Sequence, residues 1–280
     1  MVRKAVIPCA GLGTRFLPAT LAVPKELLPI DRKPAIQHIV ADLVECGVDT
    51  VVLVISRGKE ALLHYFLDDH RLAGKRLPPE LTQSIEELAL LRERVNVVAV
   101  YQEKPLGLGH AVLCAAPVVG DEPFLLALPD DHFRPSPTRQ LVEAWEKYGK
   151  GAVALLEVPN EDVPRFGIVS VEREETPFLL LNDAVEKPTL EAAPSRLAIM
   201  GRYLFPPKVF EYLRNTPPGI NSEIQLTDSM KTLAQKEGLV GVPVSGEYLD
   251  IGTWDSYVRT LMRLGLEDPA FREFLTRHLH

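Results

Sequence analysis

An unbroken run of β-branched and aliphatic residues, Thr50 to Ile55, is the feature that most constrains the fold of this chain. A strand that faces water on one side alternates apolar and polar residues, whereas a strand covered on both faces is apolar throughout. The run therefore predicts an interior strand of a parallel sheet that carries helices on both of its faces.

The rest of the first half alternates similar runs with helical patterns, at spacings that suit crossovers between parallel strands. Apolar residues at helical spacing follow Pro34 and end at Gly47. We further expect helices from Lys59 to about His70, from Glu80 to Arg94 and from Gly109 to Ala116, a loop from Gly74 to Pro79, and strands from Val95 to Tyr101 and from Phe124 to Leu128. The fold class is therefore α/β, with a doubly wound, mostly parallel sheet. Ligands of such sheets bind beyond the carboxyl ends of the strands.

The second half has a different pattern, because its apolar runs follow one another with few helices between them. These runs predict strands that extend the sheet in a mixed, partly antiparallel way: Gly151 to Val158, Gly167 to Val171, Phe178 to Val185, Leu197 to Phe205 and Leu239 to Val244. Helices are expected over Pro206 to Asn215, Gln225 to Glu237 and Trp254 to Leu264. A last helix after Asp268 and Pro269 gathers Phe271, Phe274, Leu275 and Leu279 on one face, and we expect that face to cap the core rather than to make a dimer contact.

Composition limits the possible partners and surroundings of the chain. With 280 residues and 46% hydrophobic content, one large domain is as plausible as two smaller ones. The net charge of −7 argues against general nucleic-acid binding, which needs a basic face. Cys9, Cys46 and Cys114 are odd in number and lack metal-ligand spacing, so we expect reduced core residues. No apolar stretch approaches membrane-spanning length, and we expect a cytoplasmic protein without membrane contact.

A glycine loop follows the first apolar run, and it predicts a polyphosphate site. Gly11 and Gly13 leave backbone N–H groups unhindered at the end of a strand, and Arg15 and Lys25 add positive charge. A dinucleotide fingerprint is disfavoured because Phe16 replaces its third glycine, and a P-loop is disfavoured because no Gly-Lys-Ser or Gly-Lys-Thr follows. A tight turn with incidental charges is the simpler alternative.

Two aspartates at other strand ends are candidates for a metal site. If the fold brings Asp130 and Asp250 together, their oxygens and substrate phosphates would suffice to hold Mg²⁺. Each taken alone could equally be a turn or capping residue. Glu186 and Lys187, at a further strand end, offer an acceptor for sugar hydroxyls and a cation for a phosphate, although alone they would be an ordinary exposed pair.

Six motifs in this order carry a resemblance to a known family. They are Ala10 to Pro18, Pro24 to Pro29, Gly107 to Val112, Leu128 to Asp131, Val185 to Pro188 and Glu223 to Asp228. Together they resemble the bacterial UTP:glucose-1-phosphate uridylyltransferases, a branch of the sugar-nucleotidyltransferase superfamily, over nearly the whole chain. The resemblance implies a Rossmann-like nucleotidyltransferase fold in one domain, 1–280, with a nucleotide-binding half (1–150), a sugar-binding half (151–250) and C-terminal helices (251–280). It also implies a homo-oligomer, either a dimer or a tetramer.

The implied reaction is direct attack of glucose 1-phosphate on the α-phosphate of UTP, assisted by Mg²⁺, which gives UDP-glucose and pyrophosphate. By motif match, the nucleotide would be held by Ala10, Gly11, Gly13, Thr14, Glu26, Gln102 and Gly107. The catalytic cations would be Arg15, Lys25 and Lys187, the sugar would be met by Asp131, Gly167 and Glu186, and the metal by Asp130 and Asp250. The Gln102 amide carries a donor and an acceptor, which suits the edge of uracil.

Two departures from the family pattern keep other interpretations open. Leu21 stands where the family places the first lysine of Thr-Lys-x-x-Pro-Lys-Glu. The segment Tyr248 to Asp255 resembles the thymidylyltransferase branch, so transfer from dTTP to a hexose 1-phosphate is one alternative. A non-catalytic sugar-nucleotide-binding regulator is another, although such a module would not need the two aspartates and Lys187.

Overall fold

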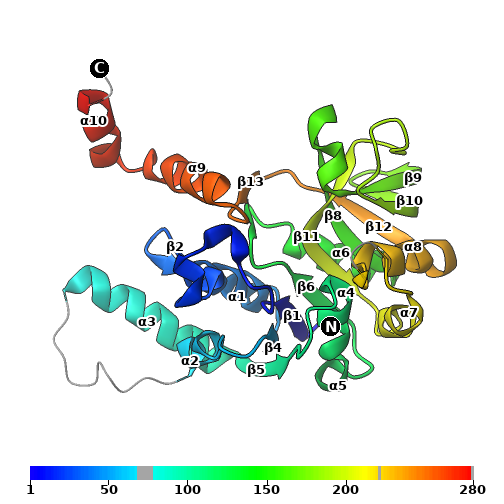
Figure 1. Cartoon of the computed structure of the whole chain (residues 1–280), viewed down its shortest axis with the longest axis horizontal. Coiled ribbons are helices and arrows are strands. Elements are labelled where there is room, and N and C mark those ends of the chain that lie inside the picture. The colour runs from blue at the N-terminus through cyan, green and yellow to red at the C-terminus, as the bar shows by residue number, and fades with distance from the viewer. Residues whose placement is uncertain (68–77, 220–221, 279–280) are drawn as a thin grey trace.

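The computed structural model describes residues 1–67, 78–219 and 222–278, and a nine-stranded sheet dominates this part of the chain (Figure 1). From one edge to the other the strands are β5 (Asn96–Tyr101), β4 (Thr50–Ile55), β1 (Lys4–Pro8), β6 (Phe124–Ala127), β11 (Leu197–Phe205), β8 (Gly151–Glu157), β12 (Leu239–Pro243), β10 (Phe178–Glu186) and β9 (Gly167–Glu175). The predicted strands of both halves are confirmed.

The sheet is parallel in the first half of the chain and mixed in the second. Strands β5, β4, β1 and β6 pair in parallel. Strand β11 is antiparallel to both β6 and β8, β12 is parallel to β8, and β10 is antiparallel to β12 and β9. The carboxyl ends of the four parallel strands consequently lie along one edge of the sheet, which is where the glycine loop begins.

Helices cover both faces of the sheet, and a hydrophobic core lies on each face. One core contains residues of α1 (Ala35–Glu45), α2 (Ala61–Phe66), α3 (Pro79–Arg94) and α6 (Thr138–Tyr148), and the other contains residues of α4 (Leu108–Cys114), α5 (Ala116–Val119), α7 (Val209–Asn215) and α8 (Leu226–Glu237). Ala5 and Ile7 of β1 face the first core, whereas Val6 faces the second. This alternation explains why the interior strands are apolar at every position.

A short ladder outside the main sheet brings two distant segments together. Strand β13 (Glu247–Asp250) pairs antiparallel with β7 (Asp131–Arg134), and the register places Asp250 opposite Asp131. Strands β2 (Pro29–Ile30) and β3 (Lys33–Pro34) form a second small ladder. The connections include short 3₁₀ helices, η1 (Thr14–Phe16), η2 (Ala19–Leu21), η3 (Lys25–Leu27) and η5 (Asn160–Arg165).

One expectation about the C-terminus is wrong. Helices α9 (Trp254–Gly265) and α10 (Pro269–His278) follow β13, and Figure 1 shows α10 projecting from one end of the molecule, away from the sheet. No residue of α10 is buried, and Phe274 is 54% exposed. The apolar face is present but no core lies against it, because α9 carries the chain outward; Leu279 lies outside the described residues.

The remaining expectations concern the cysteines and the segment after α2. Cys9 is buried as expected, but Cys46 and Cys114 are only half-buried, and all three are free thiols. The helix expected to reach His70 ends at Phe66. Residues 68–77, which include most of the predicted loop from Gly74, are outside the part of the chain that the structure describes. Within that part, no helix is long and apolar enough to cross a membrane.

Candidate active site

The glycine loop after β1 forms one wall of a cavity of about 280 Å³. Ala10 and Gly11 line this smaller cavity, and a side chain at Gly11 would meet no atom within 4 Å. Gly13 adopts a left-handed φ of 65°, and its carbonyl oxygen accepts a hydrogen bond from the Thr20 hydroxyl at 2.9 Å. Glycine is the residue that adopts this conformation without strain, so the loop can turn back before η1.

The opposite wall of the smaller cavity comes from the carboxyl end of β5. Gln102 directly follows this strand, is 8% exposed, and lines the cavity together with Gly107. Its amide nitrogen Nε2 donates to the Gly107 carbonyl at 3.0 Å and lies 2.9 Å from Nδ1 of His110. A buried amide is therefore held in one orientation beside the cavity.

Two motifs far apart in sequence are joined behind this wall. The Gly109 amide donates to the Ile224 carbonyl at 2.9 Å, and the Ile224 amide donates to the Leu106 carbonyl at 2.8 Å. A Cβ on Gly109 would lie 2.7 Å from the Ile224 carbonyl oxygen, and Gly107 has a φ of 94°. The close approach of Ile224 explains why residue 109 is a glycine, and the left-handed backbone explains why residue 107 is one.

A larger cavity of about 450 Å³ adjoins the smaller one, since Leu108 lines both. Seven of the sequence-predicted residues line it beside Leu108: Arg15, Asp130, Asp131, Gly167, Glu186, Lys187 and Asp250. A side chain at Gly167 would crowd Ile199 and Thr227. The structure therefore gathers the residues assigned to the metal and to the sugar phosphate around one space.

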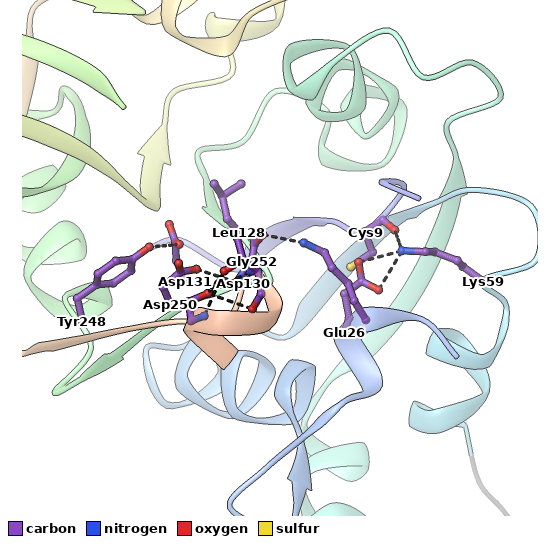
Figure 2. A network of polar contacts seen from close by, with 12 residues as sticks. Cys9, Glu26, Lys59, Leu128, Asp130, Asp131, Tyr248, Asp250 and Gly252 are labelled. Carbon is purple, nitrogen blue, oxygen red and sulfur yellow. Dashed lines mark hydrogen bonds and ion pairs between the residues drawn. The ribbon is translucent and has the colours of Figure 1, made fainter. Parts of the chain in front are cut away.

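Asp130 and Asp250 lie on either side of Gly252. A Cβ placed on Gly252 would be 3.0 Å from Asp250 Oδ1 and 3.2 Å from Asp130 Oδ2, so the two carboxylates flank the same glycine. The Gly252 amide donates to Asp250 Oδ1 at 2.7 Å, and the Ile251 amide donates to the Asp130 carbonyl at 3.0 Å. Figure 2 shows both carboxylates in one polar cluster with Asp131.

Lys25 adds a positive charge to this cluster. Its Nζ donates to Asp130 Oδ2 at 2.6 Å. Burial alone would raise the pKa of Asp130, but the charge and hydrogen bond of Lys25 outweigh burial and hold that pKa below its usual value. Burial alone would likewise lower the pKa of Lys25, yet Asp130 and Glu26 hold it above its usual value. Both groups are therefore charged at neutral pH.

The two carboxylates suit a divalent cation. Among the described residues, no group of three or more His, Cys, Asp and Glu side chains could hold a metal ion. Two hard oxygen donors at one glycine nonetheless match the way Mg²⁺ is bound by one or two carboxylates together with substrate phosphates. The residues present therefore fit such an ion if the substrate completes its coordination.

Asp131 has a different environment from this pair. Its carboxylate accepts hydrogen bonds from the Gly201 amide and from the Tyr248 hydroxyl, both at 2.7 Å. Burial first, and the negative charge of Asp130 second, raise the pKa of Asp131 to about 6. Asp131 is thus fixed in position by its two donors, and it is more easily protonated than Asp130.

Glu186 and Lys187 also line the larger cavity. Lys187 Nζ lies 2.8 Å from Glu186 Oε1, while the buried Thr227 hydroxyl donates to Glu186 Oε2 at 2.6 Å. Lys187 has a φ of 44°, a costly conformation for a residue with a side chain, and its amide donates to the Phe166 carbonyl at 3.1 Å. The chain thus holds an exposed lysine in a strained turn at the cavity edge.

Glu26 lies apart from both cavities. Its carboxylate is 1% exposed and binds the Lys59 ammonium, 2.9 Å from each oxygen, and Lys59 also donates to the Cys9 carbonyl at 2.7 Å (Figure 2). Gly13 and Thr14 also line neither cavity. In this structure Glu26 supports the glycine loop from behind.

Sequence reasoning missed several polar residues that position the predicted ones. Lys59, His110, Thr227 and Tyr248 each make a hydrogen bond to a residue that had been assigned a role. His110, Thr227 and Tyr248 fall within motifs that had been quoted, so their positions carried a signal. Lys59 lies outside them all, and only the fold reveals its partner.

Comparisons with known proteins agree on one family. A model of the nucleotidyl transferase family matches residues 4–265. The chain is 39% identical over 280 residues to UTP–glucose-1-phosphate uridylyltransferase YngB of Bacillus subtilis, covering 99% of this chain and 94% of that protein. It is similar to a solved UDP-glucose pyrophosphorylase complexed with UDP-glucose, with a TM-score of 0.89 and 34% identity over 96% of this chain and 100% of that one. A UTP-bound UGPase from Acinetobacter baumannii gives a TM-score of 0.86 and 34% identity over 100% of this chain and 99% of that one.

Proposed function

This chain belongs to the nucleotidyl transferase family, and from that premise we propose that it makes UDP-glucose and pyrophosphate from UTP and glucose 1-phosphate. One observation carries the proposal: a carboxylate pair, Asp130 and Asp250, borders a cavity that Lys187 also lines and that adjoins a second cavity lined by Gln102. The two spaces suit a sugar phosphate and a nucleotide base that share a phosphate-binding centre.

In this reaction a phosphate oxygen of glucose 1-phosphate forms a bond to the α-phosphorus of UTP, and the bond to pyrophosphate breaks. The enzyme forms no covalent bond, so its task is to align two anions and stabilise the charge that develops. Gln102 and the backbone of Ala10, Gly11 and Gly107 hold the base. Arg15 and Lys25 meet the triphosphate of UTP.

Lys187 binds the phosphate of the sugar substrate, and Glu186 accepts hydrogen bonds from its hydroxyls. The Thr227 hydroxyl donates a hydrogen bond to one Glu186 oxygen, and this bond fixes the orientation of the carboxylate. Asp131 and Gly167 border the space for the sugar ring. We thus assign residues 1–150 to the nucleotide and 151–250 to the sugar, within one domain.

A divalent metal is generally used by nucleotidyltransferases of this family, and we propose Mg²⁺ held by Asp130 and Asp250. When bound, such an ion stabilises negative charge on phosphate oxygens. The two aspartates contribute the hard oxygens, and Lys25, which contacts Asp130, aligns the neighbouring phosphate.

The assay is release of pyrophosphate from UTP and glucose 1-phosphate with Mg²⁺, with dTTP as the competing nucleotide. Loss of a preorganised group that stabilises the transition state lowers turnover by about 10²- to 10³-fold. The turnover of Asp130→Asn and of Asp250→Asn should therefore each be lower than that of the wild type by at least about 10²-fold. Asp121→Asn, an exposed aspartate at the other end of β6, is the matched control. Near-normal turnover in either site variant would refute the two-carboxylate site, and a preference for dTTP would reassign the base. The homo-oligomer and the cytoplasmic location stay predictions, the first testable by light scattering.

A further inference from the structure

The orientation of the Gln102 amide depends on His110. The Gln102 Nε2 group has two acceptors, the Gly107 carbonyl at 3.0 Å and His110 Nδ1 at 2.9 Å. An amide nitrogen carries two hydrogens, so these partners use both. No described residue donates a hydrogen bond to Oε1 of Gln102, and the side chain lines the smaller cavity.

The protonation state of the His110 ring supports the orientation in which Gln102 Nε2 donates to it. Burial lowers the pKa of His110, so the imidazole is neutral at pH 7 and one of its nitrogens is an acceptor. The Cys114 thiol lies 3.8 Å from the same Nδ1, and a thiol is a weak donor. Both neighbours of Nδ1 are therefore donors, which favours the tautomer that carries its hydrogen on Nε2.

Reversal of the amide would be unfavourable. It would place the Gln102 oxygen against the Gly107 carbonyl oxygen and against the lone pair of His110 Nδ1. Two hydrogen bonds would be replaced by two contacts between acceptors, inside a buried site where unpaired polar groups are costly.

We infer that His110 is a positioning residue that makes the base cavity selective for uracil over cytosine, by holding the Gln102 carbonyl toward the base. This inference rests on the proposed function, which gives Gln102 to the base. Uracil presents a donor at N3, which Gln102 Oε1 can accept, whereas cytosine presents an acceptor there. A site built to pair with one pattern rejects the other because its buried group is left unpaired.

The test compares His110→Leu with His110→Asn, two side chains of similar size. Leucine removes the acceptor, while the asparagine carbonyl restores one at about the position of Nδ1. A neutral hydrogen bond contributes about 0.5 to 1.5 kcal/mol, so the ratio of kcat/KM for UTP over CTP should fall by about 2- to 13-fold in His110→Leu. His110→Asn should retain the wild-type ratio. If the leucine variant does not fold, His110→Phe keeps the ring and removes the nitrogen.

The ratio separates positioning from a general structural role. Equal losses for UTP and CTP, or the same change in the asparagine variant, would overturn the inference. Calorimetric titrations with UTP and CTP give the ratio of the two affinities, which tests the same selectivity without turnover. If the wild-type protein bound UTP selectively but made no UDP-glucose, the proposed function would fail while the role of His110 would stand.

Discussion

Replacing Lys59 with methionine should destabilise the protein by leaving a buried charge unpaired. Lys59 makes three hydrogen bonds, two to the Glu26 carboxylate and one to the Cys9 carbonyl. The side chains of Lys59 and Glu26 are 10% and 1% exposed. Lys59→Met therefore leaves a fully buried carboxylate without its counter-ion, a change that costs about 3–5 kcal/mol in other proteins.

The loss in unfolding free energy at pH 7 should thus be about 3–5 kcal/mol. Adding Glu26→Gln should restore most of this loss, because the amide carries no charge to bury.

Urea unfolding of the wild type, both single variants and the double variant at pH 7 gives the coupling energy of the pair. Lys187→Met, which removes an exposed lysine, is the control for the loss of a charge. A loss below about 1 kcal/mol at pH 7 would refute the account of Glu26 as a buried support of the glycine loop. A direct role for Glu26 at the base would appear instead as a change in the KM for UTP in a stable double variant.

Three further perturbations test other parts of the structure. Burial, and then the charge of Arg202, lower the pKa of His132 to about 3, so between pH 6.5 and pH 3 only the unfolded chain binds a proton at this residue. This difference should lower the free energy of unfolding by up to about 5 kcal/mol over that pH range. His132→Leu should therefore make the urea midpoint less sensitive to acid. Gly201→Ala would place a methyl group against Asp131 Oδ2 and 2.6 Å from Leu128 Cβ, so we expect a loss of about 1–3 kcal/mol and a raised KM for glucose 1-phosphate; wild-type values for both would contradict this packing. Leu21 is exposed on η2, and Leu21→Lys should change the KM for UTP by less than about tenfold, since an exposed charge is worth at most about 1 kcal/mol; a switch of preferred sugar phosphate would show a real divergence.

The strands of the sheet could be predicted because each one is recognisable from consecutive residues of the sequence. Each parallel strand is a continuous apolar run, and a run covered on both faces has few alternatives. The placement of Asp130 after β6 followed from the same run. That Asp250 would lie beside it could only be proposed, because the pairing of β13 with β7 joins segments more than 110 positions apart.

The error at α10 shows the limit of this reasoning. Amphipathic spacing predicts that a helix has an apolar face, but it does not say which surface covers that face. Phe271, Phe274 and Leu275 lie on such a face, yet the helix leaves the body of the molecule. The pairing of Lys59 with Glu26 was hidden for a related reason, since a lysine outside any motif normally lies in solvent.

The two cavities are linked through backbone contacts that the order of motifs only suggests. Gly109 and Leu106, beside the base cavity, share hydrogen bonds with Ile224. Three residues later, at the start of α8, Thr227 holds the Glu186 carboxylate at the sugar cavity. The glycine motif and the Glu-Ile-Gln-Leu-Thr-Asp motif therefore depend on each other structurally. Gly109 leaves space for Ile224 to approach within hydrogen-bond distance, while Ile224 holds the wall of the base cavity and Thr227 holds Glu186 at the sugar cavity.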